Sequence, residues 1–370
     1  MPQLQAEPRS ARTRPDTLRA PSGRLTTDRP SRRRVLKSGL GAGLGLGAAG
    51  LLGACSATVS TADASSSGGS ASSGAWTFTD DRGTTVHLGG TPTRVIAYTG
   101  TAAALYDFGV TDRIVGVFGP TKLTDGKADP MAGNLPVDKL KILGNAYGEF
   151  DVAAYAELNP QLLVTDMWEK NSLWYVPTAS LSKITELAPT IGITVASEPL
   201  TTPLARYEKL AGLLGADLTA PGVASAKTAF EQAVEQLRST AKSKGTIKVM
   251  AASASADLLY ISDPTVYPDL SYYRQLGVSF IEPTNVVGGF FENLSWENAG
   301  KYQADLILLD DRTGTLQPAD LTGKATWTAL PAVKAGQIVG WNSEPRYSYQ
   351  AIGPIVDGVA TALRDARKVA

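Results

Sequence analysis

The sequence predicts an α/β fold made of two lobes with mostly parallel sheets, joined by one long α-helix. The first observation is that short apolar runs alternate with helical segments in residues 76–219. The second is that the same alternation starts again in residues 246–370, and the third is the amphipathic segment 220–245 between the two halves. Short buried strands that alternate with helices are typical of parallel sheets covered on both faces. Each half is therefore expected to form its own lobe.

Residues 220–245 are predicted to form the connecting helix. Pro221 suits the first turn of a helix, and Gly245 suits the position after its last turn. At about 1.5 Å per residue, a helix of this length is long enough to cross the back of two lobes. The alternative is a single α/β domain in which the segment is one more surface helix. Apolar residues recur along it at spacings of three and four, which is typical of one buried stripe: Val223, Ala226, Phe230, Ala233, Val234, Leu237 and Ala241.

The N-terminal lobe is expected to begin with a hairpin over residues 76–88. Asp80 and Gly83 are among its turn residues. The elements after the hairpin alternate: strands are expected at residues 94–100, 113–119, 140–144 and 161–168, and helices at 101–108, 152–158, 181–187 and 204–214.

The C-terminal lobe repeats this pattern. Strands are expected at residues 246–253, 257–262, 278–283, 305–310 and 336–342, and helices at 270–277, 294–303 and 348–367.

Composition restricts the class of function. The chain has 35 basic and 35 acidic side chains, and residues 1–54 hold ten of the basic and three of the acidic ones, so the rest is acidic, with a net charge of about −7. Such a protein is not expected to bind nucleic acid. A single cysteine, Cys55, excludes an internal disulfide. The single histidine, His87, is too few for a histidine-built metal site, and a solvated position at a strand end is expected for it.

Residues 1–54 have the features of an export signal. Arg32, Arg33 and Arg34 precede an uncharged run rich in Gly and Leu, as in a twin-arginine signal. The run is too short and too weakly apolar to span a membrane comfortably. The sequence that ends at Cys55 resembles the lipobox of bacterial lipoproteins, which implies that the cysteine is lipidated and anchors the protein at the outer face of the cytoplasmic membrane. Residues 55–75, rich in Ser, Gly and Ala, are predicted to be a flexible tether.

Residues 80–117 resemble the opening of the bacterial periplasmic binding proteins for iron siderophores and vitamin B12. The resemblance rests on an acidic-Gly hairpin, a Pro-x-Arg-Val before the first strand and an Ile-Val-Gly-Val strand. It continues in AELNPQLLVTD, with Gln161 where the family usually has an acid, and in LSWENAGKYQADLILL. The family implies two rigid lobes, one long helix between them, and a ligand cleft between the lobes opposite that helix.

The expected ligand-binding residues follow from the rule that the carboxyl ends of strands line the ligand crevice in open α/β sheets. Aromatic rings and guanidinium groups suit a ferric chelate, because the rings pack on its organic periphery and arginine binds its oxygen atoms. Iron would arrive as part of this chelate, so no cofactor is expected. Trp174 and Tyr175 are further candidates. The main candidates are Tyr98, Phe118, Trp168, Tyr260, Phe291, Arg312, Trp341 and Arg346.

Acidic residues on each lobe would contact the membrane permease, as the resemblance implies. Glu297 occupies that position in the C-terminal lobe. The matching position in the N-terminal lobe is Ala153, a departure from the family, so Glu149 or Asp151 is expected to take the role. Asp151 would equally suit the N-terminus of a helix.

The resulting hypothesis is a monomeric substrate-binding lipoprotein of an ABC importer, which carries a ferric hydroxamate or catecholate siderophore and catalyses no reaction. Haem or cobalamin is the alternative ligand within the family. An exported enzyme, or a scaffold of similar fold, is the alternative outside it. The chain lacks a phosphate-binding loop in a βαβ context and a nucleophile elbow, and this disfavours the enzyme.

Overall fold

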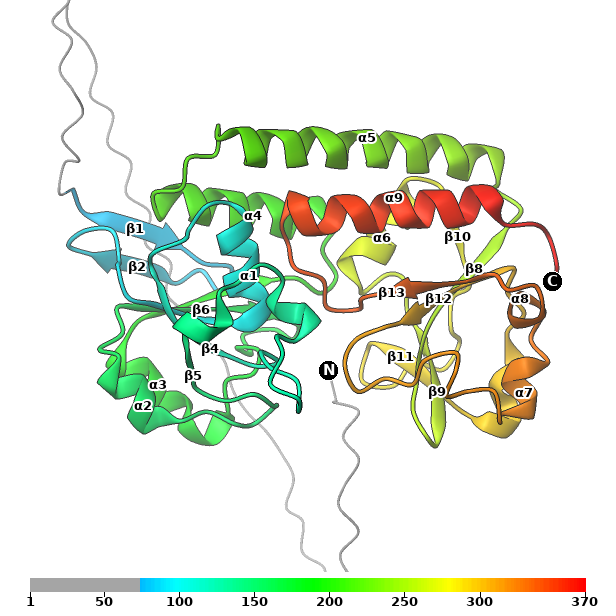
Figure 1. Cartoon of the computed structure of the whole chain (residues 1–370), viewed down its shortest axis with the longest axis horizontal. Helices are drawn as coiled ribbons and strands as arrows, with labels where there is room; N and C mark the ends of the chain where they lie inside the picture. The colour runs from blue at the N-terminus through cyan, green and yellow to red at the C-terminus, as the bar shows by residue number, and fades with distance from the viewer. Residues whose placement is uncertain (1–73) are drawn as a thin grey trace, which may run out of the picture. The chain divides into compact units, whose positions relative to one another are not determined.

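Two β-sheets, one formed before helix α5 (Pro221–Ser243) in the chain and one after it, are the centres of the two lobes (Figure 1). The computed structural model of the protein describes residues 74–370. Cys55, the export signal and most of the tether lie outside these residues. Within the described part, no helix combines the length and the apolar character needed to cross a membrane.

The sheet of the N-terminal lobe is entirely parallel. Its strand order is β5-β4-β3-β6-β7. The strands are β3 (Val95–Tyr98), β4 (Ile114–Phe118), β5 (Lys141–Ile142), β6 (Leu162–Met167) and β7 (Thr190–Thr194). The predicted strands are confirmed, with a shorter β5, whereas β7 was not predicted. Four of its five residues are β-branched and favour a strand, and only Gly192 interrupts the run, so the sequence held a usable signal for β7 that was missed. The strand pairs in parallel with β6.

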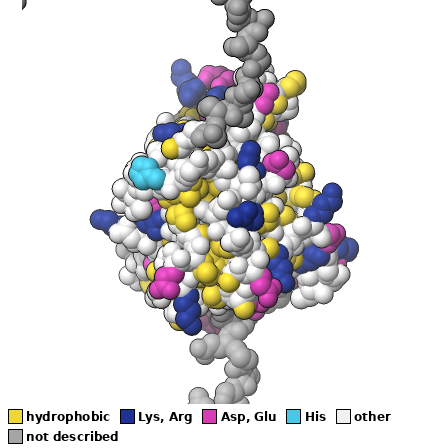
Figure 2. All heavy atoms as spheres, turned by 90° about the vertical axis from the view of Figure 1, so that its left-hand side faces the viewer, with side chains coloured by type: hydrophobic (Ala, Val, Ile, Leu, Met, Phe, Trp, Pro, Cys, Tyr) yellow, Lys and Arg dark blue, Asp and Glu magenta, His cyan; other side chains and the backbone are white. Residues whose placement is uncertain are grey.

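Four α-helices and a hairpin complete this lobe. The helices are α1 (Thr99–Asp107), α2 (Val152–Glu157), α3 (Leu181–Leu187) and α4 (Thr201–Leu213), and the antiparallel hairpin is β1 (Trp76–Thr79) with β2 (Thr85–Leu88). His87 lies on the exposed side of β2 (Figure 2), and its Nδ1 is 2.7 Å from the hydroxyl of Thr77. On the face shown in Figure 2, basic and acidic side chains are interspersed.

The sheet of the C-terminal lobe is mixed. Strands β8, β12 and β13 are parallel neighbours, β10 pairs in parallel with the start of β8, and β9 and β11 are added antiparallel at one edge. The strands are β8 (Lys248–Ala254), β9 (Leu258–Ser262), β10 (Ser279–Phe280), β11 (Phe291–Ser295), β12 (Leu306–Asp310) and β13 (Ile338–Trp341). The helix predicted over residues 294–303 is wrong in part: the end of β11 comes first, and a 3₁₀-helix, η4 (Trp296–Lys301), follows.

Helix α5 lies alongside α9 (Tyr349–Asp365), the last helix of the chain (Figure 1). The predicted apolar stripe is confirmed, since all its members are buried except Ala226, which is half-buried. Phe230 of α5 packs on Tyr349 of α9, with ring centroids 5.5 Å apart. The remaining helices of this lobe are α6 (Pro268–Gln275), α7 (Ala325–Thr328) and α8 (Pro331–Lys334).

Candidate ligand-binding site

Parallel strands place several predicted residues at the carboxyl ends of the two sheets. Tyr98 and Phe118 are the last residues of β3 and β4, and Trp168 directly follows β6. In the other sheet Trp341 ends β13, and Arg312 stands two residues after the end of β12. Since neighbouring parallel strands end at one edge, each lobe presents its candidates together.

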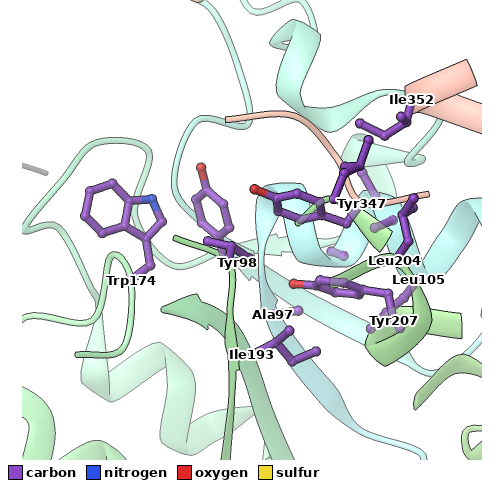
Figure 3. Packing of buried hydrophobic residues seen from close by; sticks show 14 of the residues in the cluster. Ala97, Tyr98, Leu105, Trp174, Ile193, Leu204, Tyr207, Tyr347 and Ile352 are labelled. Carbon is purple, nitrogen blue, oxygen red and sulfur yellow. The ribbon is translucent and has the colours of Figure 1, made fainter. Parts of the chain in front are cut away.

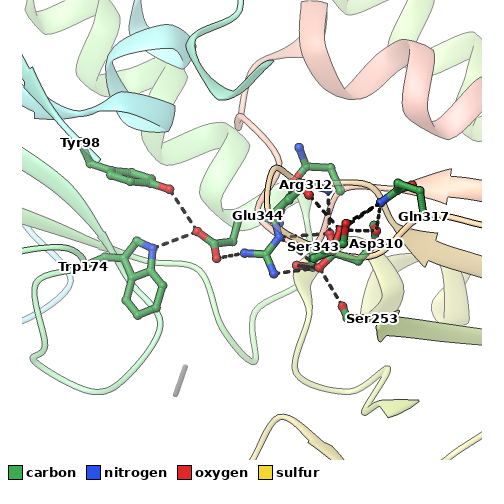
Figure 4. A network of polar contacts seen from close by, with 10 residues as sticks. Tyr98, Trp174, Ser253, Asp310, Arg312, Gln317, Ser343 and Glu344 are labelled. Atoms are coloured by element: carbon green, nitrogen blue, oxygen red, sulfur yellow. Dashed lines mark hydrogen bonds and ion pairs between the residues drawn. The ribbon is translucent and has the colours of Figure 1, made fainter. Parts of the chain in front are cut away.

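Glu344, in the segment between β13 and α9, joins the two lobes (Figure 4). Its Oε2 accepts a hydrogen bond of 3.0 Å from the hydroxyl of Tyr98 and another of 3.0 Å from the indole Nε1 of Trp174. Its Oε1 forms an ion pair with Arg312. Glu344 is only 5% exposed. A buried carboxylate thus links the carboxyl end of β3 to the loop that follows β12.

Arg312 is held between two carboxylates. Its Nη2 is 2.8 Å from Oδ2 of Asp310, and its Nε also donates to that carboxylate, while Nη1 pairs with Glu344. Burial raises the pKa of Asp310, but the charge and hydrogen bonds of Arg312 outweigh this effect and lower it below its ordinary value. Asp310 therefore remains ionised. It also accepts hydrogen bonds from Ser253 and Ser343, at 2.7 and 3.1 Å.

A cavity of about 460 Å³ adjoins this network. A volume of this size is typical of small-molecule sites. Arg312 and Arg346 are the two main candidates that line it. The other lining residues come from the segments after β4 and β6, from β13 and the segments beside it, and from α9: Pro120, Asp129, Pro130, Met131, Tyr175, Asp311, Thr313, Val339, Gly340, Asn342, Glu344, Pro354, Ile355, Gly358 and Val359.

Arg346 makes a second contact between the lobes. Its Nη1 donates a hydrogen bond of 2.7 Å to the carbonyl oxygen of Pro130. Its guanidinium lies against Gly133, where an added Cβ would be 2.8 Å from Cζ. Gly133 also has a φ of +52°, a conformation that favours glycine. The close approach of Arg346 therefore depends on the absence of a side chain at residue 133.

Aromatic rings of the N-terminal lobe surround the Glu344 contact. Tyr98 and Tyr175 have ring centroids 5.0 Å apart, and Tyr175 meets Trp174 edge to face at 5.5 Å. Tyr147 contacts both Trp174 and Tyr175 and is 45% exposed. Tyr175 lines the cavity and Tyr147 is exposed, so these two rings can pack on a ligand with an organic periphery, whereas Tyr98 and Trp174 are buried behind them.

The other main candidates do not line the cavity. Trp168 is buried among Trp174, Tyr267 and Phe290, with centroid distances of 6.0 to 6.4 Å. Phe118 is fully buried behind Tyr98.

Two of the C-terminal candidates pair with each other. Tyr260 and Phe291 are 5.1 Å apart across the antiparallel β9 and β11. Trp341 is buried and donates from Nε1 to Asp269 at 2.7 Å. A role in ligand binding stays a prediction for each of these residues and for Trp168 and Phe118.

Two buried carboxyl groups lie near the junction. Tyr207 donates a hydrogen bond to Asp166 and stacks on Tyr347, with centroids 5.9 Å apart (Figure 3). Burial raises the pKa of Asp166 to about 7, and the negative charge of Glu344 adds to the effect. Burial likewise raises the pKa of Asp269 to about 6. Both carboxyl groups therefore titrate near neutral pH.

The predicted permease contacts lie at the surface. Glu297 is exposed in η4. Asp151 is exposed and caps α2, since its side chain accepts a hydrogen bond from the amide of Ala154 at 2.9 Å. Glu149 accepts hydrogen bonds from the amides of Asn145 and Ala146, at 3.0 Å each. Asp151 thus lies at the N-terminus of a helix, as its alternative role requires, and a permease contact stays a prediction for all three residues.

Sequence reasoning missed Glu344, Tyr147 and Asp311. Glu344 follows the end of β13 and stands two residues before the candidate Arg346, so its position was a usable signal. An acid was not expected there, because rings and guanidinium groups are the side chains that suit a ferric chelate.

Comparisons with known proteins agree with this architecture. A family model described as "Periplasmic binding protein" matches residues 95–345. The crystal structure of DesE, a ferric-siderophore receptor protein from Streptomyces coelicolor, is 48% identical over 80% of this chain and 100% of that one, with a TM-score of 0.77. A comparison with curated protein sequences finds no match.

More distant solved structures share the fold. The petrobactin-binding protein YclQ from Bacillus subtilis has a TM-score of 0.62 at 16% identity, over 79% of this chain and 99% of that one. FeuA from the same organism, a triscatecholate siderophore binding protein, has a TM-score of 0.54 at 18% identity, over 72% and 91%. The family match covers more than half of the sequence, and the chain belongs to the periplasmic binding protein family.

Proposed function

We propose that this protein is the substrate-binding component of an ABC importer and that it captures a ferric siderophore between its two lobes. The observation that carries the proposal is the 48% identity to a ferric-siderophore receptor over the whole length of that receptor. The described geometry supports it, because rings and arginines of both lobes meet around Glu344 and the adjoining cavity.

The ligand would be bound as an intact chelate. Tyr147 and Tyr175 supply aromatic surface, supported by Tyr98 and Trp174, and Arg346 supplies a cation that forms no ion pair within residues 74–370. Such groups recognise the periphery and oxygen atoms of a chelate without coordinating its iron. Haem and cobalamin, the alternative ligands within the family, are the ligands to test beside siderophores.

Delivery to a membrane partner completes the proposal. As a member of a periplasmic binding protein family, the chain acts outside the cytoplasm. The lipobox at Cys55 would tether it to the membrane, and exposed Glu297, with Glu149 or Asp151, would face the permease. A ligand that favours the closed arrangement of the lobes shifts their equilibrium, and the permease would recognise that form.

Tryptophan fluorescence tests the ligand class. Purified protein is titrated with ferric hydroxamates, ferric catecholates, ferric citrate, haem and cobalamin, and each metal-free chelator serves as a control. Saturable quenching by a ferric siderophore at submicromolar concentration is expected, because Trp174 lies in the aromatic cluster. Quenching by haem or cobalamin alone would replace the siderophore with that ligand.

A further inference from the structure

The charges at the junction between the lobes do not cancel. Asp310 and Glu344 supply two carboxylates, and Arg312 supplies one guanidinium, which pairs with both. Asp310 is 0% exposed and Glu344 is 5% exposed. Arg312 binds the two carboxylates through Nε, Nη1 and Nη2. The group as a whole therefore carries a buried net negative charge, because the one guanidinium is shared between two carboxylates.

The other charged residues that line the cavity also have a net negative charge. Beyond Glu344 and Arg312, the charged residues of the lining are two acids, Asp129 and Asp311, and one base, Arg346. Desolvation raises the pKa of Asp311, and the neighbouring charge of Asp310 adds to the effect.

Lysines close in sequence to the cavity wall are neutralised by other acids. Lys122 pairs with Asp138 at 2.6 Å, and Lys127 pairs with Asp125 at 2.8 Å. All four side chains lie outside the cavity lining. Neither lysine is therefore available to reverse the sign of the wall.

Ferric siderophores differ in charge according to their chelating groups. Each catecholate loses two protons on binding iron, so a ferric triscatecholate is triply negative. Each hydroxamate loses one, so a ferric trihydroxamate is neutral at its centre, and a free terminal amine makes the whole complex singly positive. Charge is thus the clearest difference that a binding site with a fixed buried charge can detect.

We propose that Glu344 is a specificity-determining residue, which selects neutral or cationic ferric trihydroxamates and rejects anionic ferric triscatecholates. The inference rests on the proposed function and narrows its ligand class. A carboxylate with little exposure repels an anionic ligand more strongly than a surface carboxylate does, because water and salt screen it less. The same carboxylate, with Asp311 beside the cavity, attracts an ammonium group.

Three ferric complexes separate charge from shape. The first is a linear trihydroxamate with a free terminal amine, the second is the same compound with the amine acetylated, and the third is a triscatecholate. Dissociation constants are measured by fluorescence quenching and checked by calorimetry. The wild-type protein is expected to bind the amine form about tenfold more tightly than the acetylated form, and the triscatecholate at least about a hundredfold more weakly.

Glu344→Gln removes the charge and keeps an oxygen that accepts hydrogen bonds from Tyr98 and Trp174. The preference for the amine form is expected to fall below about threefold, and binding of the triscatecholate is expected to strengthen. Glu235→Gln, on the exposed side of α5, makes the same change in net charge and should leave the order of the three affinities unchanged. If Glu344→Gln does not fold, Asp311→Asn tests the same effect at an exposed carboxylate of the cavity.

The outcomes separate this inference from the proposed function. Tight binding of the triscatecholate by the wild-type protein, or an unchanged ranking in Glu344→Gln, would overturn the role of Glu344 while leaving siderophore binding intact. Binding of none of the three complexes would contradict the proposed function itself, and the inference with it.

Discussion

The hydroxyl of Tyr98 in the N-terminal lobe donates a 3.0 Å hydrogen bond to the carboxylate of Glu344 in the C-terminal lobe. Burial, followed by the charge of Glu344, raises the pKa of Tyr98 well above its ordinary value, so the hydroxyl stays protonated and donates throughout the physiological range. Glu344 also pairs with Arg312. This contact therefore connects the aromatic cluster of one lobe with the charged network of the other.

Tyr98→Phe should lower the free energy of unfolding by about 2 kcal/mol, because it removes a hydrogen bond to a buried carboxylate. Affinity for a ferric chelate should fall as well, since Tyr98 belongs to the proposed site. Urea denaturation and fluorescence titration measure the two effects. Tyr349→Phe is the matched control: it removes a hydroxyl bonded to Glu208 at 2.9 Å, beside α5, and should leave the affinity unchanged. Equal affinity losses in both variants would contradict a specific role of Tyr98.

Gly133→Ala should destabilise the protein more than Gly126→Ala. Both glycines have positive φ, at +52° and +84°, so each substitution has a backbone cost of about 1 to 2 kcal/mol. The new Cβ at residue 133 would also be 2.8 Å from the Arg346 guanidinium, whereas nothing lies within 4 Å of a Cβ at residue 126. Thermal denaturation of both variants measures the difference.

The same comparison in an Arg346→Ala background tests whether the contact with Arg346 causes the extra destabilisation by Gly133→Ala. The extra cost of Gly133→Ala should disappear there, because the group that it displaces is gone. An extra cost that persists without Arg346 would show that the contact is not its source.

Asp166→Asn should flatten the dependence of stability on pH. The pKa of Asp166 is raised from 3.8 to about 7 in the folded protein, so its contribution to stability is fully present below pH 3.8 and is lost as pH rises through about 7. The amide resembles the protonated form and can still accept a hydrogen bond from Tyr207. The variant should therefore gain stability relative to wild type between pH 4 and 8, by at most about 4 kcal/mol.

Urea denaturation at pH 5 and pH 8 measures this effect, with the exposed Asp112→Asn as the control. Some pH dependence should remain in Asp166→Asn, because the pKa of Asp269 is also raised, to about 6. A wild-type protein that becomes more stable from pH 5 to pH 8 would contradict the assignment.

Glu297→Ala should abolish uptake of the iron chelate in cells while leaving binding by the purified protein unchanged. Glu297 is exposed in η4, and a rim charge acts on association with a partner more than on the fold. Asp320→Ala, at another exposed acid of the same lobe, serves as the control. Normal uptake by the Glu297 variant would exclude it from the permease contact.

Local pattern was sufficient for most of the fold. The helix expected over residues 220–245 is observed at Pro221–Ser243, because an apolar stripe with a proline at one end and a glycine at the other defines a helix locally. The five-residue strands β7 and β11 were not predicted. In β11, Glu292 and Asn293 have low strand preference, and pairing with β9 determines the conformation. In β7, four of the five residues are β-branched, so its strand could have been recognised from the sequence.

The candidate site was less predictable. Strand ends identified Tyr98 and Arg312 correctly as residues at the junction of the lobes. Whether a residue at a strand end reaches the cavity depends on the direction of its side chain, which the sequence does not give. Phe118 and Trp341 also end strands, but their side chains are buried. The position of Glu344 after β13 could be read from the sequence, but its three partners could not, since they lie 32 to 246 residues away.

Isothermal titration calorimetry of the purified protein with a ferric trihydroxamate tests the central claim most directly. The account predicts saturable binding of one ferric complex per chain at submicromolar concentration, and much weaker binding of the metal-free chelator. Absence of binding by this complex, and by every other ferric siderophore under the same conditions, would contradict the assignment of the protein to siderophore capture.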